Sequence, residues 1–371
     1  MNPETLRADI PALDDGTVYL NTGASGPAPN RVLAAASDAQ REQEVDHHRG
    51  NPYPEAWDAY DESRAAVADL LGTDPDTVAL TNSTADGISR VANAVEWERG
   101  DAVVRTDLEH PAGVLPFQRL ESAGVEVREV AAPGGRLDRD AYADAVADAA
   151  FVCLSSLSWL HGTQLPVRDA VELAHDAGAF VLVDAVQSVG HHPVDVEAWG
   201  ADAVAAAGHK WLLGVWGAGF LYVSSDVVGD LRPRHIGYRS VPKGADGLEF
   251  NPGAARFEVG TQSLAPHAAL REAIAIRSEL GADTVSNRIE TLAKRLVDGL
   301  GDRVVSPRPP ESGLVAFEDP TPEATVDRLA DAGIHVRTVP GDRIRASVHV
   351  FNDVADVDAL LAALDEQNEA E

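Results

Sequence analysis

Two ionisable residues, Asp184 and Lys210, each follow a short apolar stretch and are the strongest candidates for chemistry in this sequence. Residues 180–183 form a β-branched run that ends on Asp184, and Gln187 follows three positions later. Residues 203–207 form a second apolar run, which ends on Gly208-His209-Lys210. In open α/β sheets, ligands bind at the carboxyl ends of the strands. We therefore expect the carboxylate and the amine to face the same crevice.

The lysine is notable because the chain contains only three, Lys210, Lys243 and Lys294. Lys243 lies in a Pro-Gly segment and Lys294 in an amphipathic helical pattern, so both are expected to be solvated. A lysine at the end of a buried strand can form a Schiff base with an aldehyde cofactor. A carboxylate can keep the pyridine nitrogen of such a cofactor protonated. The pair therefore indicates pyridoxal phosphate.

The sequence resembles the class V aminotransferase family of fold-type I pyridoxal-phosphate enzymes, which includes cysteine desulfurases and isopenicillin-N-epimerase-like proteins. The motifs that carry the resemblance are Asp184-x-x-Gln187 and Gly208-His209-Lys210, with Gly217-Ala218-Gly219 after them. The resemblance implies that Lys210 forms the aldimine and Asp184 pairs with the pyridinium. It also implies that Gln187 lies near the cofactor's phenolic oxygen and that His209 contacts the cofactor.

The family resemblance implies a three-layer α/β fold, with a mainly parallel sheet in a large domain and a smaller C-terminal α/β domain. We expect an N-terminal extension over residues 1–15, the large domain over 16–262 and the small domain over 263–371. Apolar runs predict further strands at 78–80, 102–106, 126–130 and 151–154. Helical patterns cover 31–43, 53–71, 139–149, 265–280, 283–300, 321–332 and 354–364. Short strands are expected near Val304, Leu314 and Ile334. Residues 343–350 alternate like a strand, with Ile344, Ala346, Val348 and Val350 on the buried face and Arg343, Arg345, Ser347 and His349 on the opposite one.

A hydroxyl-rich turn, residues 81–87, leads into a predicted helix that begins at Ile88. Free backbone N–H groups and the positive end of the helix dipole favour a phosphate at such a turn. An N-cap without a ligand would give the same pattern. The resemblance implies a phosphate site with Ser83 and Thr84 as the hydroxyls.

The remaining site residues are expected from the resemblance. His110 follows a predicted strand in a Glu-His-x-Ala context and would stack on the cofactor ring. Arg345, in Arg345-Ala346-Ser347, would bind the substrate carboxylate. Four more are expected from the resemblance. Asn21 and Ala24 of an N-terminal loop, and Trp159, where desulfurases usually carry Asn, would line the substrate site, and Thr261 would reach the cofactor of a dimer partner.

The reaction type is less determined than the cofactor. In cysteine desulfurases, a loop before the Arg-x-Ser strand carries a cysteine that attacks the substrate sulfur. Here that segment, residues 336–342, contains no cysteine. We therefore expect transamination of a small L-amino acid, or a cysteine-independent C–S or β-elimination. Desulfuration and a catalytically silent pyridoxal-phosphate-binding partner protein are the alternatives.

The composition indicates which partners and which cellular environment suit this protein. A net charge of −30 disfavours a nucleic-acid partner and favours a salt-rich environment, where self-repulsion is screened. No apolar run could span a bilayer and no secretory signal is evident, so a cytoplasmic protein is expected. The family resemblance of Gly260-Thr261 implies a homodimer with shared active sites. His47-His48 lacks a third ligand at metal-site spacing, so no metal is expected. The single cysteine, Cys153, lies in an apolar strand pattern and is expected to be a buried hydrophobe.

Overall fold

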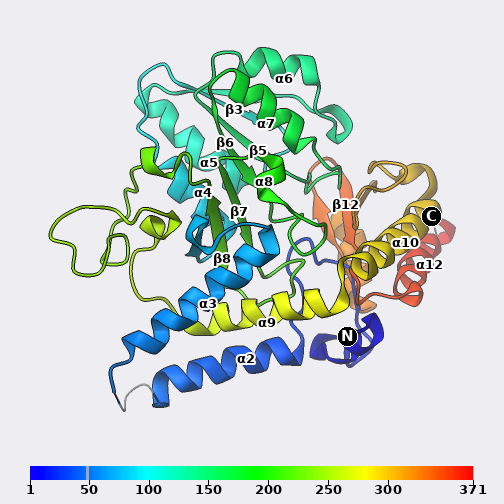
Figure 1. The fold of residues 1–371 in the computed structure, drawn as a ribbon. Helices are drawn as coiled ribbons and strands as arrows, with labels where there is room; N and C mark the ends of the chain where they lie inside the picture. Colours follow the sequence, from blue (N-terminus) through cyan, green and yellow to red (C-terminus); the bar gives the residue numbers. More distant parts are fainter. Residues whose placement is uncertain (47–49, 371) are drawn as a thin grey trace.

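The computed structural model describes residues 1–46 and 50–370 and is built around a seven-stranded sheet (Figure 1). Its strand order is β2-β8-β7-β6-β5-β3-β4. The bounds are β2 (Val78–Thr81), β3 (Ala102–Thr106), β4 (Glu126–Val130), β5 (Phe151–Ser155), β6 (Phe180–Asp184), β7 (Ala203–Ala207) and β8 (Gly219–Val223). The expected α/β fold with a mainly parallel sheet is confirmed.

Strands β3 to β7 pair in parallel, whereas β8 runs antiparallel to both β2 and β7. Sequence analysis did not predict β8, because its first residue, Gly219, follows two glycines that are typical of a loop. A side chain at Gly219 would meet the backbone of Ser83 at 2.6 Å, so the glycine permits close packing of the strand on the Ser83 turn.

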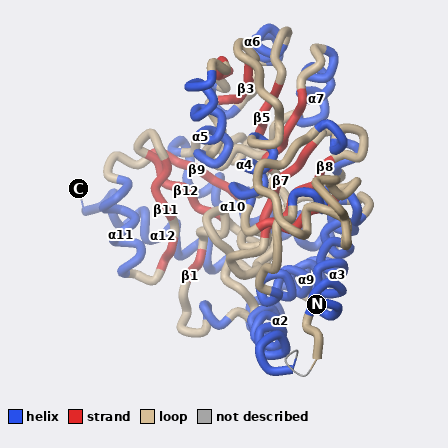
Figure 2. Tube along the Cα trace, turned by 90° about the vertical axis from the view of Figure 1, so that its left-hand side faces the viewer, coloured by secondary structure: helices blue, strands red, loops and turns tan. Residues whose placement is uncertain are grey.

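Helices cover both faces of the sheet and give three layers (Figures 1 and 2). Apolar side chains alternate along β6: Val181 and Val183 belong to one core cluster, and Leu182 belongs to another. The helices of this part of the chain are α1 (Pro3–Ala8), α2 (Asn30–Arg41), α3 (Tyr53–Leu71), α4 (Thr84–Ala92), α5 (Pro111–Leu120), α6 (Arg139–Val146), α7 (Val167–Asp176), α8 (Val196–Trp199) and α9 (Leu264–Leu280). Helix α4 begins four residues before the predicted Ile88, since Ser83 is its N-cap.

A smaller three-stranded antiparallel sheet has the order β11-β12-β9. It comprises β9 (Leu314–Glu318), β11 (Arg337–Val339) and β12 (Arg343–Ser347). Helices α10 (Ala282–Leu300) and α11 (Pro322–Asp331) pack on it, and α12 (Val354–Ala370) packs against α10. The strand predicted at Val304 is only an isolated bridge to Phe317. No helix in the described part of the chain combines the length and apolarity needed to cross a membrane.

The N-terminal segment pairs with the C-terminal part of the chain. Strand β1 (Val18–Tyr19) runs parallel to β10 (Ile334–His335), and Asn21 forms a bridge with Ser347. Residues 18–26 thereby connect the small sheet to the segment that contains Lys210, because the Gly26 N–H donates to the His209 carbonyl at 2.8 Å. The proposed domain limits remain a prediction.

Candidate functional site

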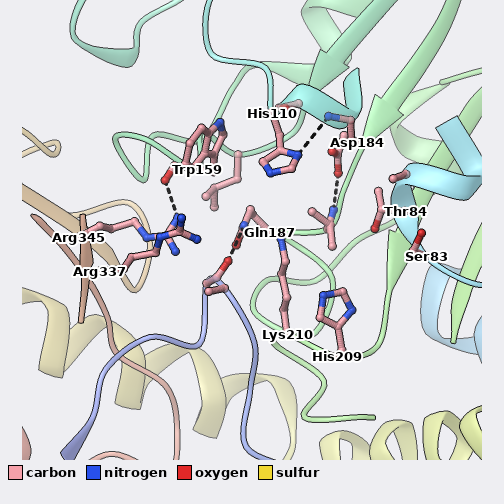
Figure 3. A pocket seen from close by; sticks show the side chains of 17 residues that line it. Ser83, Thr84, His110, Trp159, Asp184, Gln187, His209, Lys210, Arg337 and Arg345 are labelled. Atoms are coloured by element: carbon pink, nitrogen blue, oxygen red, sulfur yellow. Dashed lines mark hydrogen bonds between the residues drawn. The ribbon is translucent and has the colours of Figure 1, made fainter. Parts of the chain in front are cut away.

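A pocket of about 250 Å³ lies where the large sheet meets the small one (Figure 3). Ten of the twelve side chains predicted for the site line it: Ala24, Ser83, Thr84, His110, Trp159, Asp184, Gln187, His209, Lys210 and Arg345. Seven further residues complete the lining: Gly23, Ala85, Ala112, Ser155, Leu157, Val186 and Arg337. The carboxyl ends of β5, β6 and β7 all contribute, as expected for a parallel sheet.

Asp184 and Lys210 form the charged centre of the pocket. Asp184 ends β6, is 5% exposed and accepts a hydrogen bond from the Val186 N–H at 3.0 Å. Burial raises the pKa of Asp184, while the Val186 N–H and the Lys210 cation oppose that rise. Burial lowers the pKa of Lys210 to about 8, against the attraction of Asp184. About a tenth of the amine is therefore uncharged at pH 7, and this form can act as a nucleophile or base.

Gln187 and His209 hold the segments around Lys210 in place. The Gln187 side-chain amide donates to the Gly23 carbonyl at 3.0 Å and accepts from the Trp211 indole N–H at 2.8 Å. Burial, with the nearby Lys210 charge, lowers the pKa of His209 to about 4. The neutral imidazole faces the pocket beside the lysine (Figure 3). Contacts of Gln187 and His209 with a cofactor stay a prediction.

The turn before α4 presents an anion-binding arrangement at the pocket wall. Ser83 is the N-cap, and its hydroxyl accepts from the Asp86 N–H at 3.1 Å. The Thr84 hydroxyl is buried and has no hydrogen-bond partner among the described residues. A buried hydroxyl without a partner is costly unless a ligand satisfies it. Together with the helix N-terminus, this residue fits the phosphate of pyridoxal phosphate.

His110 lies over the pocket at the start of α5. Its Nδ1 accepts from the Ala112 N–H at 3.2 Å, and its ring meets Trp159 edge-on, with centroids 5.4 Å apart. Burial is the largest cause lowering the pKa of His110, and Lys210 adds to it. Nδ1 as an acceptor leaves Nε2 to carry the proton of the neutral ring. Stacking of this ring on a cofactor stays a prediction.

Arg345 extends from β12 toward the pocket (Figure 3). Its side chain is 1% exposed, and one terminal nitrogen donates to the Trp159 carbonyl at 2.8 Å. Within residues 1–46 and 50–370, the Nε and the other terminal nitrogen have no hydrogen-bond partner. Two unpaired donors on one planar guanidinium match the two oxygens of a carboxylate. Burial lowers the pKa of Arg345 to about 9, and a bound carboxylate would favour its charged form.

The sequence predicted that Arg345 and Ser347 lie on the face of the strand opposite the buried one, but in the structure that face is buried as well. Both are buried, because residues 20–23 cover that face of β12. A side chain at Gly23 would come within 2.9 Å of both the Arg345 guanidinium and the Ser347 hydroxyl. The absence of a side chain at Gly23 therefore leaves room for the arginine.

Two predicted residues, Asn21 and Thr261, do not line the pocket. The Asn21 side-chain oxygen is buried without a partner beside β12. Thr261 is exposed on the surface of the single chain, so its action across a dimer interface stays a prediction. His47 and His48 lie outside the described residues. Within the described residues no group of three or more His, Cys, Asp or Glu side chains could hold a metal ion.

Sequence analysis missed two ionisable residues near the site. Arg337 was noted only as part of a loop without cysteine, yet it lines the pocket beside Arg345 (Figure 3). Glu109 lies behind the pocket wall, where it accepts from the Ser155 N–H at 3.1 Å and the Thr106 hydroxyl at 2.7 Å. Burial raises the pKa of Glu109 to about 7. Only the position of Glu109 directly before His110 could have drawn attention to it.

Cys153 is a buried core residue, as expected. It lies within β5, is 0% exposed, and its pKa is raised well above the ordinary value by burial. It does not line the pocket. Because reactive thiols need an accessible and electropositive setting, Cys153 is unsuited to nucleophilic chemistry.

Comparison with known proteins identifies the family. The aminotransferase class-V model matches residues 18–360. A probable cysteine desulfurase of Methanothermobacter thermautotrophicus is 33% identical, over 99% of this chain and 98% of the relative. The apo structure of a cysteine desulfurase from Thermococcus onnurineus NA1 is 28% identical, with a TM-score of 0.91 over 100% of this chain and 99% of that chain.

A third similar protein, C-DES, has 28% identity and a TM-score of 0.88 over 96% of this chain and 98% of its own. In that structure glycine is covalently linked to a pyridoxal-phosphate cofactor. Another structure of C-DES, named a cystine C–S lyase, holds cysteine persulfide as its reaction product.

These relatives correct the expected reaction. Transamination or a cysteine-independent elimination was preferred over desulfuration because residues 336–342 lack a thiol, and that preference is wrong: relatives along the whole chain are named cysteine desulfurases. The physical reason is that the cofactor activates the amino acid in such enzymes, whereas the thiol only accepts sulfur and can belong to another molecule. The fold, the pocket and the match over residues 18–360 together show that this chain belongs to the aminotransferase class-V family.

Proposed function

We propose that this protein is a pyridoxal-phosphate-dependent cysteine desulfurase, which converts L-cysteine to L-alanine and passes the sulfur to an acceptor thiol. The observation that carries the proposal is the convergence of Lys210, Asp184 and the unpaired guanidinium of Arg345 in one pocket. The names of the relatives favour sulfur chemistry for this set of residues. A catalytically silent binding protein would not require the two unpaired arginine donors.

The cofactor of this enzyme is pyridoxal phosphate, as expected from the sequence. When bound, it withdraws electrons from the Cα of the amino acid. Lys210 holds the cofactor and moves the proton at Cα, and Asp184 holds the proton of the pyridine nitrogen. Thr84 and the α4 N-terminus bind the phosphate. Arg345 binds the substrate carboxylate through its free Nε and terminal nitrogen.

Sulfur leaves by transfer to a thiol. The acceptor thiolate attacks the substrate Sγ, and the Cβ–Sγ bond breaks with its electron pair remaining on Cβ. A proton then converts Cβ to the methyl group of alanine, and the acceptor becomes a persulfide. One thiol and one cysteine thus give one persulfide and one alanine, so no external oxidant is needed. Cys153 is buried away from the pocket, so the acceptor belongs to another molecule.

The experiment uses the protein reconstituted with pyridoxal phosphate, L-cysteine and excess 2-mercaptoethanol. We expect alanine and persulfide in equal amounts. Lys210→Ala should abolish alanine formation and the visible absorbance of the bound cofactor, while the exposed Lys294→Ala control should retain both. Pyruvate with ammonia as the main products, or keto acid with an aminated cofactor, would contradict the proposal.

The protein acts as a homodimer in a salt-rich cytoplasm. Support for dimerisation comes from the family resemblance of Gly260-Thr261, and support for high salt from the net charge of −30. Light scattering measures the dimer directly. Mixing Lys210→Ala with Thr261→Ala chains tests whether sites are shared, because one intact site would then form and activity would exceed that of either variant alone.

A further inference from the structure

Arg337 places a second guanidinium in the pocket that nothing in the reaction above uses. It extends from β11, on the strand next to the one that contains Arg345, and lines the same pocket (Figure 3). Its register partner across the two strands is Arg345 itself. The positive charge of Arg337 is close enough to contribute to lowering the pKa of Lys210 and of Arg345.

The charge of Arg337 is not neutralised within the described part of the chain. Its Nε donates to the Thr338 carbonyl at 3.3 Å, and no carboxylate there is paired with it. Asp184 is the one acidic side chain among the residues that line the pocket. Arg337 is exposed, so water solvates its guanidinium, and it remains free to bind an anion that enters the pocket.

The position of Arg337 coincides with the missing sulfur acceptor. It belongs to residues 336–342, the segment in which desulfurases are expected to carry their cysteine. Here this segment contributes a cation to the pocket in place of a thiol. Because the chain's single thiol is buried, the acceptor must enter from solution, and the segment can bind it rather than provide it.

We propose that Arg337 binds the carboxylate of a small acceptor thiol, such as a second molecule of cysteine, and directs its sulfur to the substrate. This inference rests on the proposed function. Arg345 holds the carboxylate of the substrate, and Arg337 holds that of the acceptor. The acceptor thiolate forms an S–S bond with the substrate Sγ while the Cβ–Sγ bond breaks and Cβ takes up a proton. The products are alanine and a small carboxylate-bearing persulfide.

A small thiol fits the site better than a thiol on a folded protein. Arg337 lines the same cavity of about 250 Å³ as Lys210, which the cofactor must share with both sulfur compounds. Trp159 and His110 close the adjacent wall with an edge-on ring contact. A single cationic side chain matches one carboxylate, and acidic small thiols meet that requirement without an extended interface.

The test compares acceptors of similar size and opposite charge: 3-mercaptopropionate, cysteamine and the neutral 2-mercaptoethanol, with L-cysteine as donor. We expect 3-mercaptopropionate to have the lowest acceptor KM in the wild type. Arg337→Glu should raise that KM about tenfold and make cysteamine the preferred acceptor. The KM of Arg337→Lys for 3-mercaptopropionate should lie between those of the wild type and Arg337→Glu. Lysine keeps the positive charge but loses the planar guanidinium that can bind both carboxylate oxygens. Because position 337 lies opposite Arg345, Arg337→Glu should also raise the KM for cysteine as donor, so the order of preference among the three acceptors is the readout.

The matched control is Arg168→Glu, which changes the net charge equally from a side chain on α7 that is 72% exposed. It should leave the acceptor preference unchanged. Alanine formed at equal rates with all three thiols, or an unchanged preference in Arg337→Glu, would overturn the role of Arg337 while leaving desulfuration intact. Absence of alanine with every thiol, including a sulfur-acceptor protein, would instead overturn the proposed function. Alanine formed only with an acceptor protein would replace the small thiol by a protein thiol.

Discussion

Glu109 offers a test of the site's electrostatics through stability. It is 6% exposed, and its carboxylate accepts from the Ser155 backbone, the Ser155 hydroxyl and the Thr106 hydroxyl. Burial nevertheless dominates and raises its pKa from 4.5 to about 7. Because the native state holds this proton more tightly than the unfolded state, the stabilisation is full below pH 4.5 and is lost as pH rises through 7.

The perturbation is Glu109→Gln, which removes the titration and keeps the shape. A glutamine oxygen can accept from the Ser155 N–H and the Thr106 hydroxyl, while its amide donates to the Ser155 hydroxyl. A rise of the pKa from 4.5 to about 7 corresponds to about 3 kcal/mol. We therefore expect the variant and the wild type to differ little at pH 5, and the variant to be about 3 kcal/mol more stable at pH 8.

The assay is thermal unfolding of both reconstituted proteins between pH 5 and pH 8 at constant salt. For a chain of 371 residues, 3 kcal/mol corresponds to a melting temperature about 4 °C higher at pH 8. The control is Glu172→Gln, an exposed glutamate on α7, whose difference from wild type should not depend on pH. A Glu109→Gln difference that is flat across this range would refute the assignment of a raised pKa.

Further predictions concern the lysine, the arginine, the N-terminal segment and the charge. The rate at which pyridoxal phosphate loads onto the apoprotein, followed by absorbance, should rise with pH toward 8 and level off above it, since only the uncharged Lys210 amine reacts. A rate independent of pH from 6 to 9 would exclude this pKa. Arg345→Lys should raise the KM for cysteine roughly 10- to 100-fold with a smaller change in kcat, because a point charge cannot hold two carboxylate oxygens; an unchanged KM would remove Arg345 from substrate binding. Gly26→Ala should destabilise the protein by about 2 kcal/mol, since its Cβ would lie 2.3 Å from the Lys210 carbonyl, whereas Gly229→Ala meets no atom within 4 Å and should be neutral. The melting temperature should increase between 0.1 and about 2 M KCl as the net charge of −30 is screened, and a melting temperature that does not rise would count against adaptation to salt.

Much of the fold followed from local patterns. Residues 180–184 and 203–207 form β6 and β7 as predicted, because continuous apolar runs are typical of strands buried on both faces. Helix α3 has the predicted bounds, Tyr53–Leu71, where a left-handed Gly72 ends it. Strand β8 escaped prediction because glycines that serve close packing look the same in sequence as glycines of a loop.

The functional site likewise contains residues that the sequence predicted and features that it did not. Asp184 and Lys210 could be placed from the sequence, since each directly follows a buried strand and parallel strands end at one edge of the sheet. The reaction could not be inferred from the missing thiol, because absence of a residue from one loop does not determine what a second molecule supplies.

The sequence by itself determined the cofactor chemistry, because that depends on residue type and on position at strand ends. Only the tertiary structure decided which other charged side chains lie close to Asp184 and Lys210. Residues 20–23 bury the face of β12 that contains Arg345, and the β11–β12 pairing brings Arg337 beside it. Glu109 is buried behind Ser155 by contacts 46 residues apart in sequence. These placements depend on packing between distant segments, which no local pattern encodes.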